Sequence, residues 1–121
     1  MPVTGWVSSP FGMRDGKMHE GVDLAADYDA PIKAAMSGRV TWAGPMGSYG
    51  NAVVLDHGNG LKTLYGHSSK LLVSQGQMVS KGQVIALVGA TGKATGPHLH
   101  MELLINGQAY DPMICFGRMS S

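Results

Sequence analysis

Residues 51–67 read NAVVLDHGNGLKTLYGH, and this stretch decides the fold. Two runs rich in Val, Leu and Tyr, at 51–57 and 61–67, are separated by a Gly-Asn-Gly segment, and Asn-Gly between such runs is a strong hairpin signal. Because side chains alternate along a strand, the odd positions from 61 to 67 share one face, and His67 ends the strand. The stretch therefore predicts two antiparallel strands.

The rest of the chain is divided into short segments in the same way. Its 18 glycines and 6 prolines leave little room for a helix of normal length. One helical turn is predicted over 68–73, with Ser68 or Ser69 as its cap. Further strands are predicted at 31–35, 38–43, 83–88 and 98–105. The predicted fold class is all-β: a compact antiparallel β-sandwich or open barrel with little helix, whose loops at 44–50 and 89–97 wall a groove.

Composition limits the class of protein. With 121 residues, 44% apolar and 14% charged, the chain is predicted to form a single domain, 1–121, whose last segment, 113–121, frays. The net charge of +1 argues against a nucleic-acid partner, and no run is apolar enough for membrane insertion. We expect a monomer with no signal peptide at residues 1–9, and the single cysteine, Cys115, cannot form an internal disulfide.

The segment His19-Glu20-Gly21-Val22-Asp23 sets an imidazole and a carboxylate four residues apart, and both are normal zinc ligands. Along a straight strand their α-carbons would lie roughly 13 Å apart, so we predict a bend at Gly21 that turns both side chains inward. A helical zincin motif is the competing interpretation, but Gly21 and Val22 disfavour a helix. Glu20 is then a solvated residue and not a general base.

The segment His98-Leu99-His100 places two imidazoles on one strand face, with α-carbons roughly 7 Å apart. Together His19, Asp23 and one histidine of this pair supply three protein ligands and leave a fourth tetrahedral position for water, as in catalytic zinc sites. The other histidine of the pair and His67 are the candidates for a proton acceptor and an oxyanion stabiliser.

These three motifs, H-x-x-x-D, Y-x-H and H-x-H in this order, resemble those of the lysostaphin-type (LytM-like) zinc endopeptidases, and the similarity runs through nearly the whole chain. The resemblance implies that His19, Asp23 and His100 bind zinc (Zn²⁺). It also implies that His67 and His98 are catalytic and flank the activated water and the developing oxyanion. The implied substrates are the peptide stems and cross-bridges of peptidoglycan.

Five further positions are left with open roles. Some members of the family have an assisting tyrosine upstream of the first ligand, where this chain has Met13. His57 either holds a loop in place or takes part in catalysis. Arg14 either pairs with a buried carboxylate or lines the groove, and Tyr49 and Asn51 either contact substrate or pack.

The predicted function is therefore a zinc-dependent endopeptidase of the cell wall, acting in the periplasm or the extracellular wall, with a phage lytic protein as one form. The alternative is a non-catalytic wall-binding or hydrolase-activating module that retains structural zinc. A third interpretation, a biotinyl- or lipoyl-type carrier domain, is prompted by residues 76–86, but that segment lacks an exposed carrier lysine in a tight hairpin.

Overall fold

The computed structural model describes residues 1–116, apart from the side chain of Arg14. These residues form strands and two short 3-10 helices, η1 (Gly47–Tyr49) and η2 (Pro112–Phe116). The strands are β1 (Trp6–Ser9), β2 (Gly12–Arg14), β3 (Lys17–His19), β4 (Val22–Ala25), β5 (Pro31–Lys33), β6 (Gly38–Pro45), β7 (Asn51–Gly58), β8 (Leu61–Leu71), β9 (Met78–Val79), β10 (Val84–Val88), β11 (His98–Ile105) and β12 (Gln108–Tyr110). The all-β prediction is confirmed.

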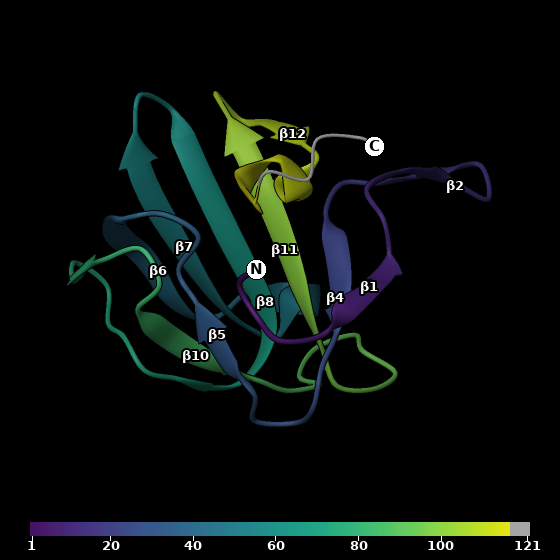
Figure 1. The fold of residues 1–121 in the computed structure, drawn as a ribbon, viewed down its shortest axis with the longest axis horizontal. Helices are drawn as coiled ribbons and strands as arrows, with labels where there is room; N and C mark the ends of the chain where they lie inside the picture. The colour runs from purple at the N-terminus through teal and green to yellow at the C-terminus, as the bar shows by residue number, and fades with distance from the viewer. Residues whose placement is uncertain (117–121) are drawn as a thin grey trace.

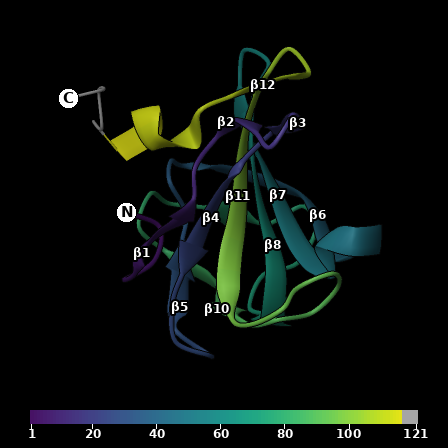
Figure 2. The same cartoon turned by 90° about the vertical axis from the view of Figure 1, so that its right-hand side faces the viewer.

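The main sheet is antiparallel and runs in the order β1-β4-β11-β8-β7-β6-β9, and Figure 2 shows its strands from β4 to β6 side by side. Its two ends, β1 and β9, do not pair with each other in the described residues, so the sheet is open and not a closed barrel. The hairpin predicted from residues 51–67 forms the middle of this sheet as β7 and β8, with Val54 opposite Leu64.

The strand β11 pairs with the two strands that carry other candidate site residues. On one side it pairs with β4, which sets His100 opposite Asp23. On its other side it pairs with β8, which sets His100 opposite Gly66. The sheet thus brings together segments that are far apart in the chain. No local sequence pattern indicates this arrangement.

The core lies on one face of the main sheet. The strands β5 and β10 pair with each other and fold over this face, as Figure 1 shows. Fully buried side chains from both layers fill the core: Ile32, Ile85 and Val88 from the β5–β10 pair, and Leu24, Leu55, Tyr65, Leu99 and Met101 from the main sheet. Because Leu99 and Met101 face this core, His98 and His100 face the opposite side of β11.

A chain of hydrogen bonds runs from the partly exposed ring of His57 to the buried hydroxyl of Tyr65. The Nδ1 of His57 donates to the carbonyl of Ser37 (2.8 Å), and its Nε2 lies 2.7 Å from Thr63 Oγ1. The hydroxyl of Thr63 is bonded to that of Tyr65 (2.9 Å), which accepts the backbone N–H of Ala35 (2.9 Å). Of the two roles considered for His57, these contacts support the one in which it holds a loop in place.

The helical turn predicted over 68–73 is wrong. The strand β8 continues to Leu71 and pairs with β10 there, with Ser68 opposite Val88 and Lys70 opposite Leu87. Ser69 does not cap a helix, because its hydroxyl donates to Asp29 Oδ1 at 2.6 Å. Pairing with β10 completes a row of backbone hydrogen bonds over several residues, which outweighs the weak local preference for a cap.

Two parts of the periphery differ from the sequence prediction. The four strands β1 to β4 were not predicted, and β2 with β3 forms a separate hairpin that projects from the molecule in Figure 1. At the other end, η2 buries Met113 against the core, and half-buried Cys115 carries a free thiol. Residues 117–121 of the predicted frayed tail lie outside the described residues.

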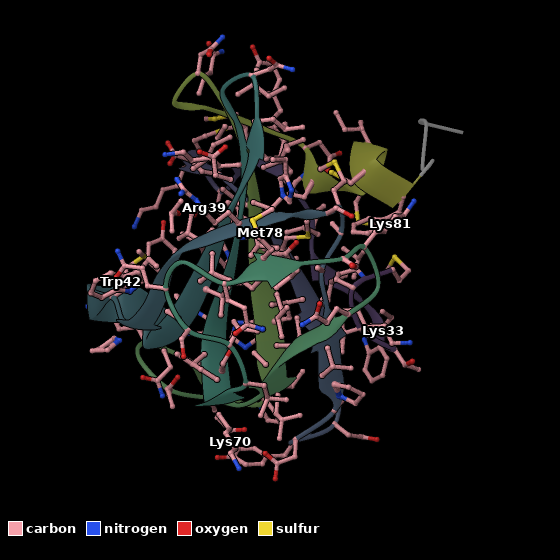
Figure 3. All side chains as sticks on the ribbon, turned by 90° about the vertical axis from the view of Figure 1, so that its left-hand side faces the viewer. Lys33, Arg39, Trp42, Lys70, Met78 and Lys81 are labelled. Carbon is pink, nitrogen blue, oxygen red and sulfur yellow. The ribbon has the colours of Figure 1, made fainter. Side chains whose placement is uncertain are left out.

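The outer surface carries isolated cationic and apolar side chains. Figure 3 shows Lys33, Arg39, Lys70 and Lys81 on different segments of one side of the molecule, together with Trp42 and Met78. Within residues 1–116, the structure contains no helix with the length and apolar character needed to cross a membrane.

We expect Tyr65→Phe to lower the free energy of unfolding by about 1–3 kcal/mol, because the buried N–H of Ala35 and the hydroxyl of Thr63 lose their shared partner. Urea denaturation at pH 7 measures the effect. Tyr110→Phe, at a tyrosine that is 39% exposed, is the matched control and should shift stability by less than about 0.5 kcal/mol. Equal stability of the two variants would contradict the role given to the Tyr65 hydroxyl.

Candidate metal centre and its flanking histidines

The three residues predicted to bind metal lie together on the face of the sheet opposite the core. His19 is the last residue of β3, Asp23 lies in β4 and His100 in β11. One potential ligand atom from each lies within 4.8 Å of the other two. Asp23 is central, because its Oδ1 lies 2.7 Å from His100 Nδ1 and its Oδ2 lies 3.5 Å from His19 Nε2.

The bend between His19 and Asp23 is at the predicted place, but its physical cause differs from the prediction. Gly21 does not adopt the left-handed backbone conformation that only glycine tolerates well. A Cβ atom at this position would lie 2.7 Å from His100 Cε1 and 2.9 Å from Glu102 Cγ. Glycine is therefore required because β11 passes so close to this segment.

His67 reaches the site through an irregularity in β8. Between the pairs Asn51–Ser68 and Val53–Tyr65, β8 has one more residue than β7, and His67 has a φ of 64°. This bulge interrupts the alternation of side chains. Tyr65 faces the core, whereas the ring of His67 lies beside that of His98, with a centroid distance of 4.7 Å. The prediction that the odd positions from 61 to 67 all share one face is therefore wrong at His67.

Three of the four imidazoles around the centre have Nδ1 bonded to a backbone carbonyl. These bonds are His19 to Pro10 at 2.9 Å, His67 to Thr91 at 2.6 Å, and His98 to Gly96 at 2.9 Å. A carbonyl oxygen only accepts hydrogen bonds, so each Nδ1 carries a proton, and in the neutral form of each ring the lone pair is on Nε2. The Nε2 atoms of His19 and His98 face Asp23, at 3.5 and 3.9 Å from its carboxylate.

The fourth imidazole, His100, has the opposite orientation. Its Nε2 lies 2.9 Å from Glu102 Oε2, while its Nδ1 faces Asp23. Glu102 is buried, with 6% of the residue exposed, and its Oε2 also accepts the hydroxyl of Tyr49 at 2.6 Å. His100 therefore lies between two carboxylates.

The charges around His100 shift the pKa values of the metal-free centre. Burial alone would lower the pKa of His100, but hydrogen bonds to Asp23 and Glu102 outweigh burial and raise the pKa to about 9. Burial alone would raise the pKa values of both carboxylates. The hydrogen bond and positive charge of His100 instead hold the pKa of Asp23 and that of Glu102 below their usual range.

The pKa of His67 is shifted in the other direction, below its usual value. Burial lowers its pKa, the bond to Thr91 partly offsets this effect, and the neighbouring His98 and His100 lower the pKa further. A depressed pKa keeps the ring neutral near pH 7, with the lone pair on Nε2 available to accept a proton.

The donor set fits a zinc ion. Two imidazole nitrogens and one carboxylate are ordinary zinc ligands, and three protein ligands are typical of catalytic zinc sites. Each imidazole has its other nitrogen bonded to an acceptor, as is usual for histidines that bind metal. A bound cation would replace the proton that His100 Nδ1 and Asp23 Oδ1 share at 2.7 Å in the metal-free centre, and it would balance the negative charge of Asp23.

A hollow of about 220 Å³ opens directly beside the centre. Asp23 and His98 form one side of it, and residues 95–97 of the loop between β10 and β11 form another. Of the two loops predicted to wall a groove, the loop at 89–97 lines this hollow, whereas no residue of the loop at 44–50 is among its lining residues. The centre is therefore accessible to a ligand from the side of His98.

Three contributors to the site were not identified from the sequence: Glu102, Thr91 and Tyr49 in its present role. Tyr49 packs its ring against His100, with a centroid distance of 5.6 Å, and uses its hydroxyl on Glu102. The spacing of Glu102 did hold a signal, because a residue two positions after His100 lies on the same strand face. Thr91 acts through its backbone carbonyl and offers no signal of this kind.

The remaining predicted positions lie at the edge of the site. Glu20 is exposed, as predicted, and Met13 is 71% exposed on the projecting hairpin. Asn51 donates from Nδ2 to the carbonyl of Ser68 at 3.3 Å, which ties β7 to β8 next to His67. The side chain of Arg14, with the two roles considered for it, lies outside the described part of the structure.

Comparison with known proteins finds a family model described as Peptidase family M23 that matches residues 17–112. The DD-carboxypeptidase/endopeptidase Mpg of Neisseria meningitidis is 46% identical over 113 residues, which cover 88% of this chain and 26% of that protein. The peptidoglycan DD-endopeptidase ShyB of Vibrio cholerae is 43% identical over 112 residues, which cover 93% of this chain and 24% of that protein. The chain thus spans about a quarter of the length of these curated relatives.

Solved structures of peptidases also resemble this chain in fold. A zinc-containing peptidase from Vibrio cholerae matches with a TM-score of 0.86 and 38% identity, covering 93% of this chain and 38% of that one. The catalytic domain of the antimicrobial peptidase lysostaphin from Staphylococcus simulans matches with a TM-score of 0.77 and 36% identity, covering 91% of this chain and 88% of that one.

Without metal, the protein should lose stability as the pH rises from about 6.5 to about 9. The pKa of His100 is about 9 in the folded protein and about 6.5 when unfolded. The stabilisation is therefore complete below pH 6.5 and disappears as the folded ring loses its proton, by at most about 1.4 kcal/mol per pH unit. Chelator-treated protein, denatured with urea at several pH values, provides the measurement, and His100→Gln should lack this slope. A flat profile for the unmodified chain would refute the ion-pair assignment.

Proposed function

Because the chain belongs to peptidase family M23, we propose that it is a zinc-dependent endopeptidase that hydrolyses peptide bonds in the stem peptides or cross-bridges of peptidoglycan. Lysostaphin, whose family the sequence motifs resemble, is among its structural neighbours. One observation carries the proposal: His19, Asp23 and His100 converge on one point, and His67 and His98 lie beside it without being needed as ligands.

The names of the relatives support the substrate class. ShyB is named a peptidoglycan DD-endopeptidase and Mpg a DD-carboxypeptidase/endopeptidase, and both align with most of this chain. The place of action is then the periplasm or the extracellular cell wall, which a phage lytic protein also reaches. A module that kept zinc only for stability would have no use for two further imidazoles beside the centre.

In this proposal, zinc is held by His19 through Nε2, by Asp23 through its carboxylate and by His100 through Nδ1. When bound, the ion supplies positive charge that polarises the scissile carbonyl and makes water more acidic. Asp23 lies between the two imidazoles and supplies the negative charge that favours a cation there. The hollow beside His98 gives the substrate access to this point.

The two flanking histidines transfer protons and stabilise developing negative charge. The low pKa of His67 leaves its Nε2 unprotonated near pH 7, so this atom accepts the proton of the attacking water. His98 is held by its bond to Gly96, with Nε2 facing the centre. The proton that His67 accepts is then available to the leaving amine, and His98 Nε2, with a proton taken from solvent, would donate a hydrogen bond to the oxygen that develops negative charge.

We expect removal of metal to abolish cleavage and zinc to restore it. Purified sacculi are incubated with untreated, chelator-treated and zinc-reconstituted protein, and new amino termini are counted after labelling. Zinc should also raise the melting temperature, since it binds the folded chain preferentially. If reconstituted protein shows the rise in melting temperature but releases no new amino termini from walls of two cross-link types, the hydrolase proposal fails while the zinc site stands.

We expect His67→Ala to lower kcat by about 10²–10⁴-fold, because it removes a proton acceptor, while zinc affinity changes little. Steady-state cleavage of a peptide released from the wall, together with a zinc titration, tests both expectations. His57→Gln is the matched control: it weakens the hydrogen bonds to Ser37 and Thr63 and should lower stability without lowering kcat. Retention of full turnover by His67→Ala would remove His67 from the mechanism.

A further inference from the structure

His100 differs from the other imidazoles of the centre in the group that orients it. His19, His67 and His98 are each bonded to an uncharged backbone carbonyl. His100 is bonded instead to a carboxylate, that of Glu102, at 2.9 Å. A carboxylate is the stronger acceptor, because a hydrogen bond to a charged group is roughly twice as strong as one between neutral groups.

Glu102 is itself held in place by Tyr49. The hydroxyl of Tyr49 donates to the same oxygen, Oε2, that accepts from His100, at 2.6 Å. The two rings also pack against each other, with a centroid distance of 5.6 Å and an interplanar angle of 32°. Tyr49 therefore contacts His100 with its ring and Glu102 with its hydroxyl, and both contacts limit the freedom of the His100 ring.

The packing leaves the side chains of Glu102 and His100 little room to move. Only 6% of Glu102 and 9% of His100 are exposed. A Cβ atom on Gly21 would collide with both side chains, so the segment between His19 and Asp23 lies directly against them. A buried carboxylate is costly unless it is hydrogen-bonded, and His100 and Tyr49 both donate to Oε2 of Glu102.

We propose that Glu102 and Tyr49 are positioning residues of the metal centre, which hold His100 with Nε2 protonated and Nδ1 directed at the ion. The inference rests on the zinc site of the proposed function. Glu102 acts through His100, because it contacts the nitrogen that faces away from Asp23. It also adds a second negative charge near the centre, so that the dication and the carboxylates of Asp23 and Glu102 balance.

Three substitutions separate the hydrogen bonds from the charge. Glu102→Gln keeps an oxygen that can accept from both His100 and Tyr49 but removes the charge. Glu102→Ala removes the charge and both bonds, and Tyr49→Phe removes one bond while the ring stays on His100. The matched controls are Glu20→Gln, which removes an exposed carboxylate next to His19, and Tyr28→Phe, at a tyrosine that is 58% exposed.

The measurements are the zinc dissociation constant, by competition with a chromophoric chelator, the visible spectrum of the Co²⁺-substituted protein and the melting temperature without metal. We expect Glu102→Ala to weaken zinc binding by about 10–100-fold and to change the Co²⁺ spectrum. Glu102→Gln should recover part of the affinity, and Tyr49→Phe should weaken binding severalfold. The two controls should match the unmodified chain in all three measurements.

Affinities and Co²⁺ spectra equal to those of the controls, in variants that remain folded without metal, would overturn the positioning role. If Glu102→Ala does not fold, Glu102→Gln and Tyr49→Phe decide the question by the same measurements. Failure of the unmodified chain to bind zinc would overturn both this inference and the proposed function. Zinc binding without cleavage of peptidoglycan would overturn only the proposed function, because the positioning role is measured by metal binding.

Discussion

Four imidazoles converge on one face of the sheet, and each can direct a lone pair at the centre only because its other nitrogen is bonded to an acceptor. The acceptors are the carbonyls of Pro10, Thr91 and Gly96 and the carboxylate of Glu102. Without these acceptors the rings could rotate or carry their single proton on the other nitrogen, and their lone pairs would no longer face the centre. The arrangement of proton donors and lone pairs at the centre depends on these four bonds.

The acceptors come from two kinds of segment, a strand and the connections between strands. Glu102 lies on the same strand as His98 and His100, so the sheet fixes its position relative to both. Thr91 and Gly96 lie in the loop between β10 and β11, and Pro10 lies in the connection between β1 and β2. The strands therefore set the distances among the side chains and the orientation of His100, whereas the connections set which nitrogen of His19, His67 and His98 faces inward.

Much of the fold could be predicted from the sequence, because the strands in its middle have a strong local pattern. Val, Leu and Tyr runs flank an Asn-Gly turn in β7 and β8, and the metal-binding candidates stand at recognisable spacings. The strands β1 to β4 escaped prediction because each has only three or four residues, too few for an alternating pattern. The left-handed conformation of His67 and the continuation of β8 from Ser68 to Leu71 depend on pairing with other strands, which local sequence does not encode.

The loop at 89–97 supports the rings of His67 and His98 through the carbonyls of Thr91 and Gly96, and this limits how the loop can vary. Gly50 and Gly92 both have positive φ, and each lies so close to the other loop that a Cβ atom would clash with its backbone. Thr91, between them, accepts the N–H of Asn51 on Oγ1 and the ring of His67 on its carbonyl. A change at these positions would move His67, whereas a change at Thr95, which is exposed and lines the hollow, can alter the wall of the hollow while the backbone that supports His67 stays in place.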